Sequence, residues 1–350
     1  MTGRKWPRSL INERVDRRGV ERALPVPWLD DVLDVRRLWQ NAGLFRYVVK
    51  RLLLAIPVLI GTSLLIYSLV YALPGDPIRA LAGDRPFTPE VMAQLRERFH
   101  LNDPFLVRYG KYIVGFLHGD FGTDFQERPV AQTVSQRLPV TLRLTVVAVA
   151  FETIIGITAG VLCAVRRGSF YDNLVLVTTT LLVSMPVFVL GFLAQYLFGF
   201  KLGWFPIAGI RDGWYSFLLP GLVLASLSMA YVARLTRTSM LETMDADFVR
   251  TARAKGISES RILLRHTLRN SLIPVVTFIG ADVGALLAGA VVTESVFNIP
   301  GLGRATFDAV RNQEGAVVVS ILTLIVFFYI FFNLVVDILY ALLDPRIRYE

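Results

Sequence analysis

Cysteine, histidine and charged side chains are scarce in this 350-residue chain. It holds one cysteine and three histidines, and only 19% of its residues are charged. The single cysteine, Cys163, excludes an internal disulfide framework, and the scattered histidines offer no spacing for a metal site. Because 54% of the residues are hydrophobic and the mean hydropathy is +0.52, the composition predicts an integral membrane protein.

Sequence motifs for nucleotide binding and catalysis are also missing. There is no Gly-x4-Gly-Lys-Ser/Thr loop, and Gly301-Leu302-Gly303 follows an apolar stretch instead of opening a βαβ unit. No nucleophile-base pair or metal cluster is evident, so we expect neither an enzyme nor a cofactor in this chain alone. The net charge of +9 lies beside apolar segments, where anionic lipid accounts for it, and nucleic acid is not an expected partner.

Six apolar stretches are long enough to cross about 30 Å of hydrocarbon. They cover residues 52–73, 138–165, 174–200, 217–235, 272–296 and 316–343. The predicted fold class is therefore an all-α integral membrane protein with six transmembrane helices. In the third stretch, Met185-Pro186 predicts a kink. In the fifth, glycines and alanines such as Gly280 and Gly284 predict close helix packing and a central position.

Basic residues between the stretches predict the orientation in the membrane. Twelve lie in alternate loops and at the C-terminus: Arg166, Arg167, Arg234, Arg237, Arg250, Arg253, Lys255, Arg261, Arg265, Arg269, Arg346 and Arg348. The short loops on the other side carry only Lys201, Arg211, Arg304 and Arg311. Both termini are thus expected in the cytoplasm, with residues 1–44 as a cytoplasmic or interfacial extension.

The segment 74–136 is expected outside the cytoplasm and carries helix-start signals at Thr88-Pro89-Glu90 and Asp103-Pro104. The second predicts an amphipathic helix ending near His118. Such a helix could lie on the bilayer surface, or it could form a gate or a surface for an external binding protein.

The polar loop at residues 236–271 separates the fourth and fifth stretches. A short run of helix formers leads to Gly256, which can reverse the chain at positive φ, and Ser258 with Glu259 can start a second helix. This order indicates a rigid element that docks on a partner protein. A DNA-binding helix-turn-helix is not expected here, because that module normally belongs to a soluble domain and not to a loop between two membrane spans.

Placing an ionisable side chain within a membrane span costs free energy, so such residues often have a function. Glu152 and Asp282 lie near the middle of the second and fifth stretches, and Glu294 lies at the outer end of the fifth. Each is a candidate for a translocation pathway. For Glu152 and Asp282 the alternative is a helix-helix contact, and for Glu294 it is loop capping. A fourth acid, Asp337, lies near the inner end of the sixth stretch.

Five motifs in order give the chain from residue 45 to 350 a family resemblance. They are Leu73-Pro74-Gly75-Asp76-Pro77, Gly119-Asp120-Phe121-Gly122, Phe248-Val249-Arg250-Thr251-Ala252-Arg253-Ala254-Lys255-Gly256, Phe297-Asn298-Ile299-Pro300-Gly301-Leu302-Gly303-Arg304 and Asp344-Pro345-Arg346-Ile347-Arg348. Together they resemble the permease subunits of binding-protein-dependent ABC importers, in the dipeptide/oligopeptide/nickel branch.

The resemblance implies a type I importer permease domain at residues 45–350 in a bacterial plasma membrane. It also implies a second homologous permease, two ATP-binding subunits that hold ATP and Mg, an extracytoplasmic solute-binding protein and a peptide substrate. In this family the polar loop is the coupling helix that contacts the ATPase. Here the candidates are Arg250, Thr251, Ala252, Arg253, Ala254, Lys255 and Gly256.

The chain departs from the broader importer pattern, because Arg250-Thr251-Ala252 stands where a Glu-Ala-Ala triplet is usual. A glutamate contact to the ATPase therefore does not carry over. Relatives that transport nickel, glutathione, haem or another solute remain alternatives for the substrate. A secondary carrier is the alternative of another class, but we find no inverted repeat and such a carrier has no use for a coupling loop.

Overall fold

The computed structural model describes residues 27–71, 88–90, 93 and 103–343, without the side chains of residues 27–47, 337 and 339–343. The chain divides into two units, Met1–Lys50 with Arg348–Glu350, and Arg51–Ile347. All contacts given below lie in the second unit. The motifs at residues 73–77 and 344–348, most of the helix expected after Thr88 and the side chain of Asp337 lie outside the described residues.

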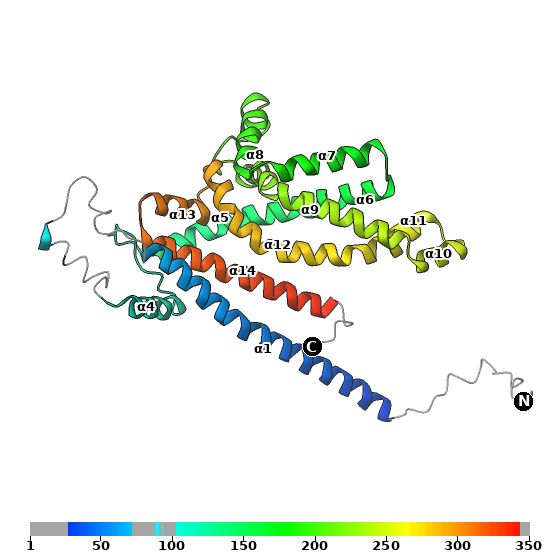
Figure 1. The fold of residues 1–350 in the computed structure, drawn as a ribbon, viewed down its shortest axis with the longest axis horizontal. Helices are drawn as coiled ribbons and strands as arrows, with labels where there is room; N and C mark the ends of the chain where they lie inside the picture. Colours follow the sequence, from blue (N-terminus) through cyan, green and yellow to red (C-terminus); the bar gives the residue numbers. More distant parts are fainter. Residues whose placement is uncertain (1–26, 72–87, 91–92, 94–102, 344–350) are drawn as a thin grey trace, which may run out of the picture. The chain divides into compact units, whose positions relative to one another are not determined.

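Every regular element among the described residues is a helix, as the sequence predicted (Figure 1). In chain order they are α1 (Pro27–Tyr71), α4 (Phe105–Leu117), α5 (Val130–Phe151), η2 (Glu152–Gly156), α6 (Ile157–Val165), α7 (Phe170–Ser184), α8 (Val187–Ala194), η3 (Gln195–Lys201), η4 (Gly213–Phe217), α9 (Leu218–Met244), α10 (Asp247–Ala254), α11 (Glu259–Arg261), η5 (Ile262–Thr267), α12 (Leu268–Val296), α13 (Leu302–Arg311) and α14 (Gly315–Leu343).

Five of the described helical stretches are long and apolar enough to cross a membrane: Val48–Tyr71, Val130–Val165, Gly213–Met244, Glu259–Val296 and Gly315–Val336. The bent pair Phe170–Ser184 and Val187–Lys201 makes a sixth if it counts as one span. The six predicted stretches therefore correspond to these segments. The second helix begins at Val130, eight residues earlier than expected, because its first turns carry polar residues such as Gln132, Ser135 and Arg137.

The expected kink at Met185-Pro186 is a full break. Helix α7 ends at Ser184 and α8 begins at Val187, and the two helices meet at 111°. Met185 is extended, with φ −104° and ψ 133°. Proline explains the break, since it lacks an N–H group, clashes with the preceding turn and disfavours the helical conformation in the residue before it.

Helix α9 forms the centre of the second unit, where it packs against α12, α6, α5, α7 and α8. In its most apolar window 72% of the residues are buried, against 33% for the α12 span. The fifth span, α12, is less buried but packs against α9, α14, α13, α5 and α8, so it shares the central position with α9. The close approach expected of α12 is confirmed, because a Cβ atom at Gly284 would lie 2.5 Å from the Tyr329 ring of α14.

The amphipathic helix expected near residues 104–118 is present as α4. Its aromatic side packs against α1 and α14, where Tyr109 and Tyr67 are buried together with Val319. The Tyr109 hydroxyl donates to the Ile60 carbonyl of α1 at 2.9 Å. Its opposite side exposes apolar residues, including Leu117 at 72%. A position at the bilayer surface stays a prediction.

Candidate functional site

The polar loop after α9 forms the helix-glycine-helix element that the sequence predicted. Helix α10 covers Asp247–Ala254, and Gly256 follows it with φ +75°. This left-handed conformation costs free energy in a residue with a Cβ, so the turn itself favours glycine. Ser258 occupies the N-cap position of α11, but its hydroxyl caps no backbone N–H group. The expected side-chain cap is therefore absent at this described residue.

A small apolar core holds α10 in place. Val249, Ala252 and Ile262 are buried against one another, and Ile257 packs beside them. Across the Gly256 turn, the Arg253 guanidinium forms a paired contact with the Glu259 carboxylate, at 2.9 Å from Nε and 3.3 Å from Nη2. The loop is therefore a folded unit.

Most of the predicted coupling residues are exposed on this unit. Arg250, Thr251, Arg253, Ala254, Lys255 and Gly256 all face away from the small core. Ala252 differs, because it is 7% exposed and packs within that core. Phe248 adds a large apolar side chain to the exposed surface, at 44% exposed. The surface offers cationic groups around one aromatic ring, a composition typical of a protein contact.

A buried ion pair connects the first turn of α7 to the C-terminal part of α9, and sequence reasoning missed it. Arg237 Nε donates to Asp172 Oδ1 at 2.7 Å, and Nη2 donates to Oδ2 at 2.9 Å. The Asp172 side chain is only 2% exposed and also accepts from the Gly168 amide. Ser169, three residues before Asp172, caps α7, so a capping pattern was a usable signal for the start of this helix.

Glu152 and Asp282 come near one another beside α9. Glu152 is fully buried at the start of the π-turn η2, and among the described residues neither of its carboxylate oxygens has a hydrogen-bond partner. Asp282 of α12 is partly exposed, and its Oδ2 likewise lacks a partner there. It lies close to the Ser228 hydroxyl and within electrostatic range of Glu152.

The third acid, Glu294, has a complete set of partners. Its Oε1 accepts from the Thr141 hydroxyl at 2.6 Å, and its Oε2 accepts from the Arg304 amide at 3.0 Å. The Thr141 hydroxyl also accepts from the Leu302 amide at 2.8 Å. A Cβ atom at Gly301 would overlap the carboxylate. Glu294 and Thr141 thus cap the N-terminus of α13, the arrangement of the loop-capping alternative, and a role of Glu294 in the pathway stays a prediction.

Two family models match most of the sequence. The inner membrane component of binding-protein-dependent transport systems matches residues 156–349, and the N-terminal membrane component of the same systems matches residues 44–145. The chain belongs to this family. It is an ABC importer permease of the dipeptide/oligopeptide type, a non-catalytic, multi-pass membrane subunit.

Curated relatives are similar over nearly their whole length. The dipeptide transport system permease protein DppB of Alkalihalophilus pseudofirmus is 37% identical over 332 residues, which cover 87% of this chain and 99% of the relative. The glutathione transport system permease protein GsiC is 40% identical over 308 residues in both Salmonella typhimurium and Escherichia coli K12, covering 88% of this chain and 100% of GsiC.

A solved structure shows the same fold. The MetNI methionine ABC transporter in an inward-facing conformation superposes with a TM-score of 0.52 and 18% identity, covering 61% of this chain and 97% of that chain. The permease thus has the type I importer fold that the resemblance implied. Family membership implies a complex with another permease, ATPase and binding-protein subunits.

Proposed function

We propose that this permease carries short peptides into the cell, together with a second homologous permease, two ATP-binding subunits and an extracytoplasmic solute-binding protein. ATP and Mg would be bound by the ATPase subunits, and both termini would lie in the cytoplasm. The relatives support a peptide substrate, because one is named for dipeptides and two for glutathione, which is itself a tripeptide.

The single observation that carries the proposal is the exposed surface of α10. A loop that only linked two spans would need neither its own buried core nor a turn at positive φ. The core fixes α10, with Arg250 and Lys255 on or beside it, against η5, and η5 in turn contacts α9. Helix α9 also ends within three residues of the start of α10. Movement of an ATPase subunit against α10 would therefore act directly on the most buried membrane helix.

Glu152 and Asp282 are proposed to belong to the pathway side of the α5–α9–α12 packing. A buried carboxylate oxygen without a hydrogen bond is costly within a span, so a partner from outside this chain would stabilise both oxygens of Glu152 and Oδ2 of Asp282. Asp282 is the more accessible of the two residues, and it is our candidate for contact with water or substrate. Glu152 is fully buried and would act through its electrostatic interaction with Asp282.

Affinity purification of the tagged permease from its native membrane tests the complex. Mass spectrometry should recover a second permease, ATPase subunits and a binding protein, and a variant with Phe248→Ala and Arg250→Ala should lose the ATPase alone. Recovery of the ATPase in undiminished amount with that variant would contradict the docking role of α10. Recovery of this chain alone would refute the proposed assembly.

Glutathione is a second candidate substrate, favoured by the relatives at 40% identity. Competition for uptake of a labelled dipeptide separates the two. Inhibition of uptake by unlabelled glutathione at concentrations similar to those of unlabelled dipeptides would favour glutathione. Inhibition by dipeptides alone would favour a dipeptide importer.

A further inference from the structure

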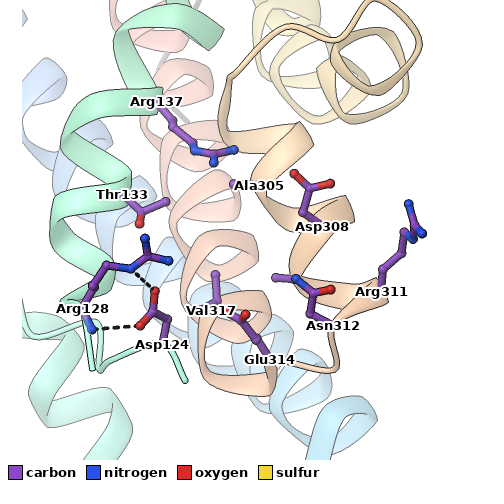
Figure 2. A pocket seen from close by; sticks show the side chains of 11 residues that line it. Asp124, Arg128, Thr133, Arg137, Ala305, Asp308, Arg311, Asn312, Glu314 and Val317 are labelled. Carbon is purple, nitrogen blue, oxygen red and sulfur yellow. Dashed lines mark hydrogen bonds and ion pairs between the residues drawn. The ribbon is translucent and has the colours of Figure 1, made fainter. Parts of the chain in front are cut away.

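A polar cavity lies between the start of α5, α13 and the start of α14, and the site described above does not use it (Figure 2). Its volume is about 390 Å³, within the range of about 300 to 1,000 Å³ that small-molecule sites have. The lining combines three basic and three acidic side chains: Arg128, Arg137, Arg311, Asp124, Asp308 and Glu314.

Half of these charges have an ion-pair partner among the described residues. Arg128 Nε donates to Asp124 Oδ2 at 2.8 Å, and this pair closes one end of the cavity (Figure 2). Asp308 lies 3.5 Å from Arg304 Nε. These pairs leave Arg137, Arg311 and Glu314, and Glu314 has a hydrogen bond to the Asn312 side chain. Because Arg311 points away from the other two (Figure 2), Arg137 and Glu314 are the groups of opposite sign that face a ligand.

Arg137 is the anchor of the cavity. Its guanidinium forms no hydrogen bond or ion pair with any other described residue, and it points into the cavity (Figure 2). Glu294, which attracts it electrostatically, is already engaged by Thr141 and the Arg304 amide. A guanidinium fork of this kind is suited to paired hydrogen bonds with a carboxylate.

Glu314 lies toward the opposite end, beside the Asp124–Arg128 pair (Figure 2). Burial raises the pKa of its carboxyl group, and the negative charge of Asp124 raises it further. An ammonium group placed there would offset both effects. The cavity thus has a free cation near one end and a carboxyl group that gains from a cation near the other.

Arg137 and Glu314 lie toward opposite ends of the cavity (Figure 2). A short peptide carries a carboxylate at one end and an ammonium group at the other, so it matches this arrangement of charge. We propose that this cavity is an extracytoplasmic subsite for a short zwitterionic peptide, with Arg137 binding the carboxylate and Glu314 binding the ammonium group. The inference rests on the proposed function and names the substrate chemistry of this one site.

The mixed lining favours a zwitterion over an acidic side chain of the binding protein. A protein carboxylate would need Arg137 alone, and it would meet repulsion from Glu314 and Asp308. A free peptide carries both charges on one molecule, so it can engage Arg137 and Glu314 together. Docking of the binding protein at this cavity is the alternative that the binding test distinguishes.

The test measures binding of Ala-Ala to the intact complex in lipid nanodiscs, without its binding protein, by calorimetric titration. Wild type should bind Ala-Ala about tenfold more tightly than alaninamide-terminated Ala-Ala, because the amide lacks the carboxylate. Arg137→Gln should weaken Ala-Ala binding by about tenfold and remove the difference between the two ligands. Arg137→Lys should lie between the two, since it keeps the charge but loses the fork.

Arg143→Gln is the matched control, because Arg143 is an exposed residue of the same helix that lies over the Trp214 ring, 6.0 Å from its centroid, and outside the cavity. It should bind both ligands as wild type does. Equal binding of acid and amide by wild type, or unchanged Ala-Ala binding by Arg137→Gln, would overturn the subsite. Loss of binding-protein affinity with unchanged Ala-Ala binding would also overturn it and indicate a docking surface.

Uptake into proteoliposomes with the binding protein separates this inference from the proposed function. If the wild-type complex imports no peptide from a peptide mixture, the proposed function fails. If wild type and Arg137→Gln import peptides equally well and bind Ala-Ala equally well, only the subsite fails.

Discussion

Substitution of Gly256 by valine is expected to uncouple ATP hydrolysis from transport while the complex still assembles. Gly256 has φ +75°, and a Cβ atom there would meet no other atom within 4 Å. The cost is therefore purely conformational, about 1–2 kcal/mol for an ordinary residue in the left-handed region and more for a β-branched one. Such a cost lowers the population of the native turn by a factor of roughly 5 to 30.

That magnitude is small against the stability of a whole domain, about 5–15 kcal/mol, so membrane insertion and the α9–α12 packing should persist. The turn itself would yield, because α11 is short and only the core around Val249 and Ile262 opposes the strain. The exposed surface of α10 would then no longer be held in one orientation against the ATPase.

The assay is the number of substrate molecules imported per ATP hydrolysed in proteoliposomes that contain the full complex. Gly256→Val should lower this ratio at least fivefold, whereas Gly256→Asn should retain most of it, because asparagine tolerates positive φ better. An unchanged ratio in the valine variant would refute the coupling role assigned to this turn. Loss of the complex on size-exclusion chromatography would refute the claim that the strain is local.

Two further predictions concern buried polar contacts. Arg237→Ala leaves the Asp172 carboxylate buried without its partner and should destabilise the permease by about 3–5 kcal/mol. The loss is measured as a lower midpoint of thermal unfolding in detergent. The double variant Asp172→Asn with Arg237→Gln should recover most of this stability, whereas an additive loss would contradict the pairing. Glu294→Ala removes the cap of α13 and should lower the free energy of unfolding by about 1–2 kcal/mol. Thr141→Ser keeps the bridging hydroxyl and should lower it less. Equal unfolding midpoints for both variants would contradict the capping role.

The sequence predicted the helical class and the six membrane segments because a helix needs about 20 consecutive apolar residues to cross the hydrocarbon core of a bilayer. It also predicted the turn at Gly256, since a helix that reverses into another helix has few alternatives to glycine. Each of these features depends on residues close together in the chain. The side chains that pair across helices were harder to predict.

The Asp172–Arg237 pair shows why. These residues are 65 positions apart, and Arg237 counted in the sequence only as one more basic residue near the cytoplasm. Thr141 and Glu294 are 153 positions apart, and nothing in either local sequence indicates that they cap the same helix. Long-range pairs of this kind follow from the packing of α5, α7, α9 and α12, which periodicity does not specify.

Helix α9 connects the features that the sequence treated separately. Its C-terminal part carries Arg237 and leads through a short turn into α10, and Ser228 in its buried middle lies next to Asp282. Because the side chains of α9 are closely packed against its neighbours, a displacement of α10 that moves α9 must also change the contacts of α9 with α5 and α12. Glu152, which has no hydrogen-bond partner among the described residues, and Asp282, which contacts Ser228, lie at those contacts, where a small displacement of α9 would alter their exposure to water and to each other.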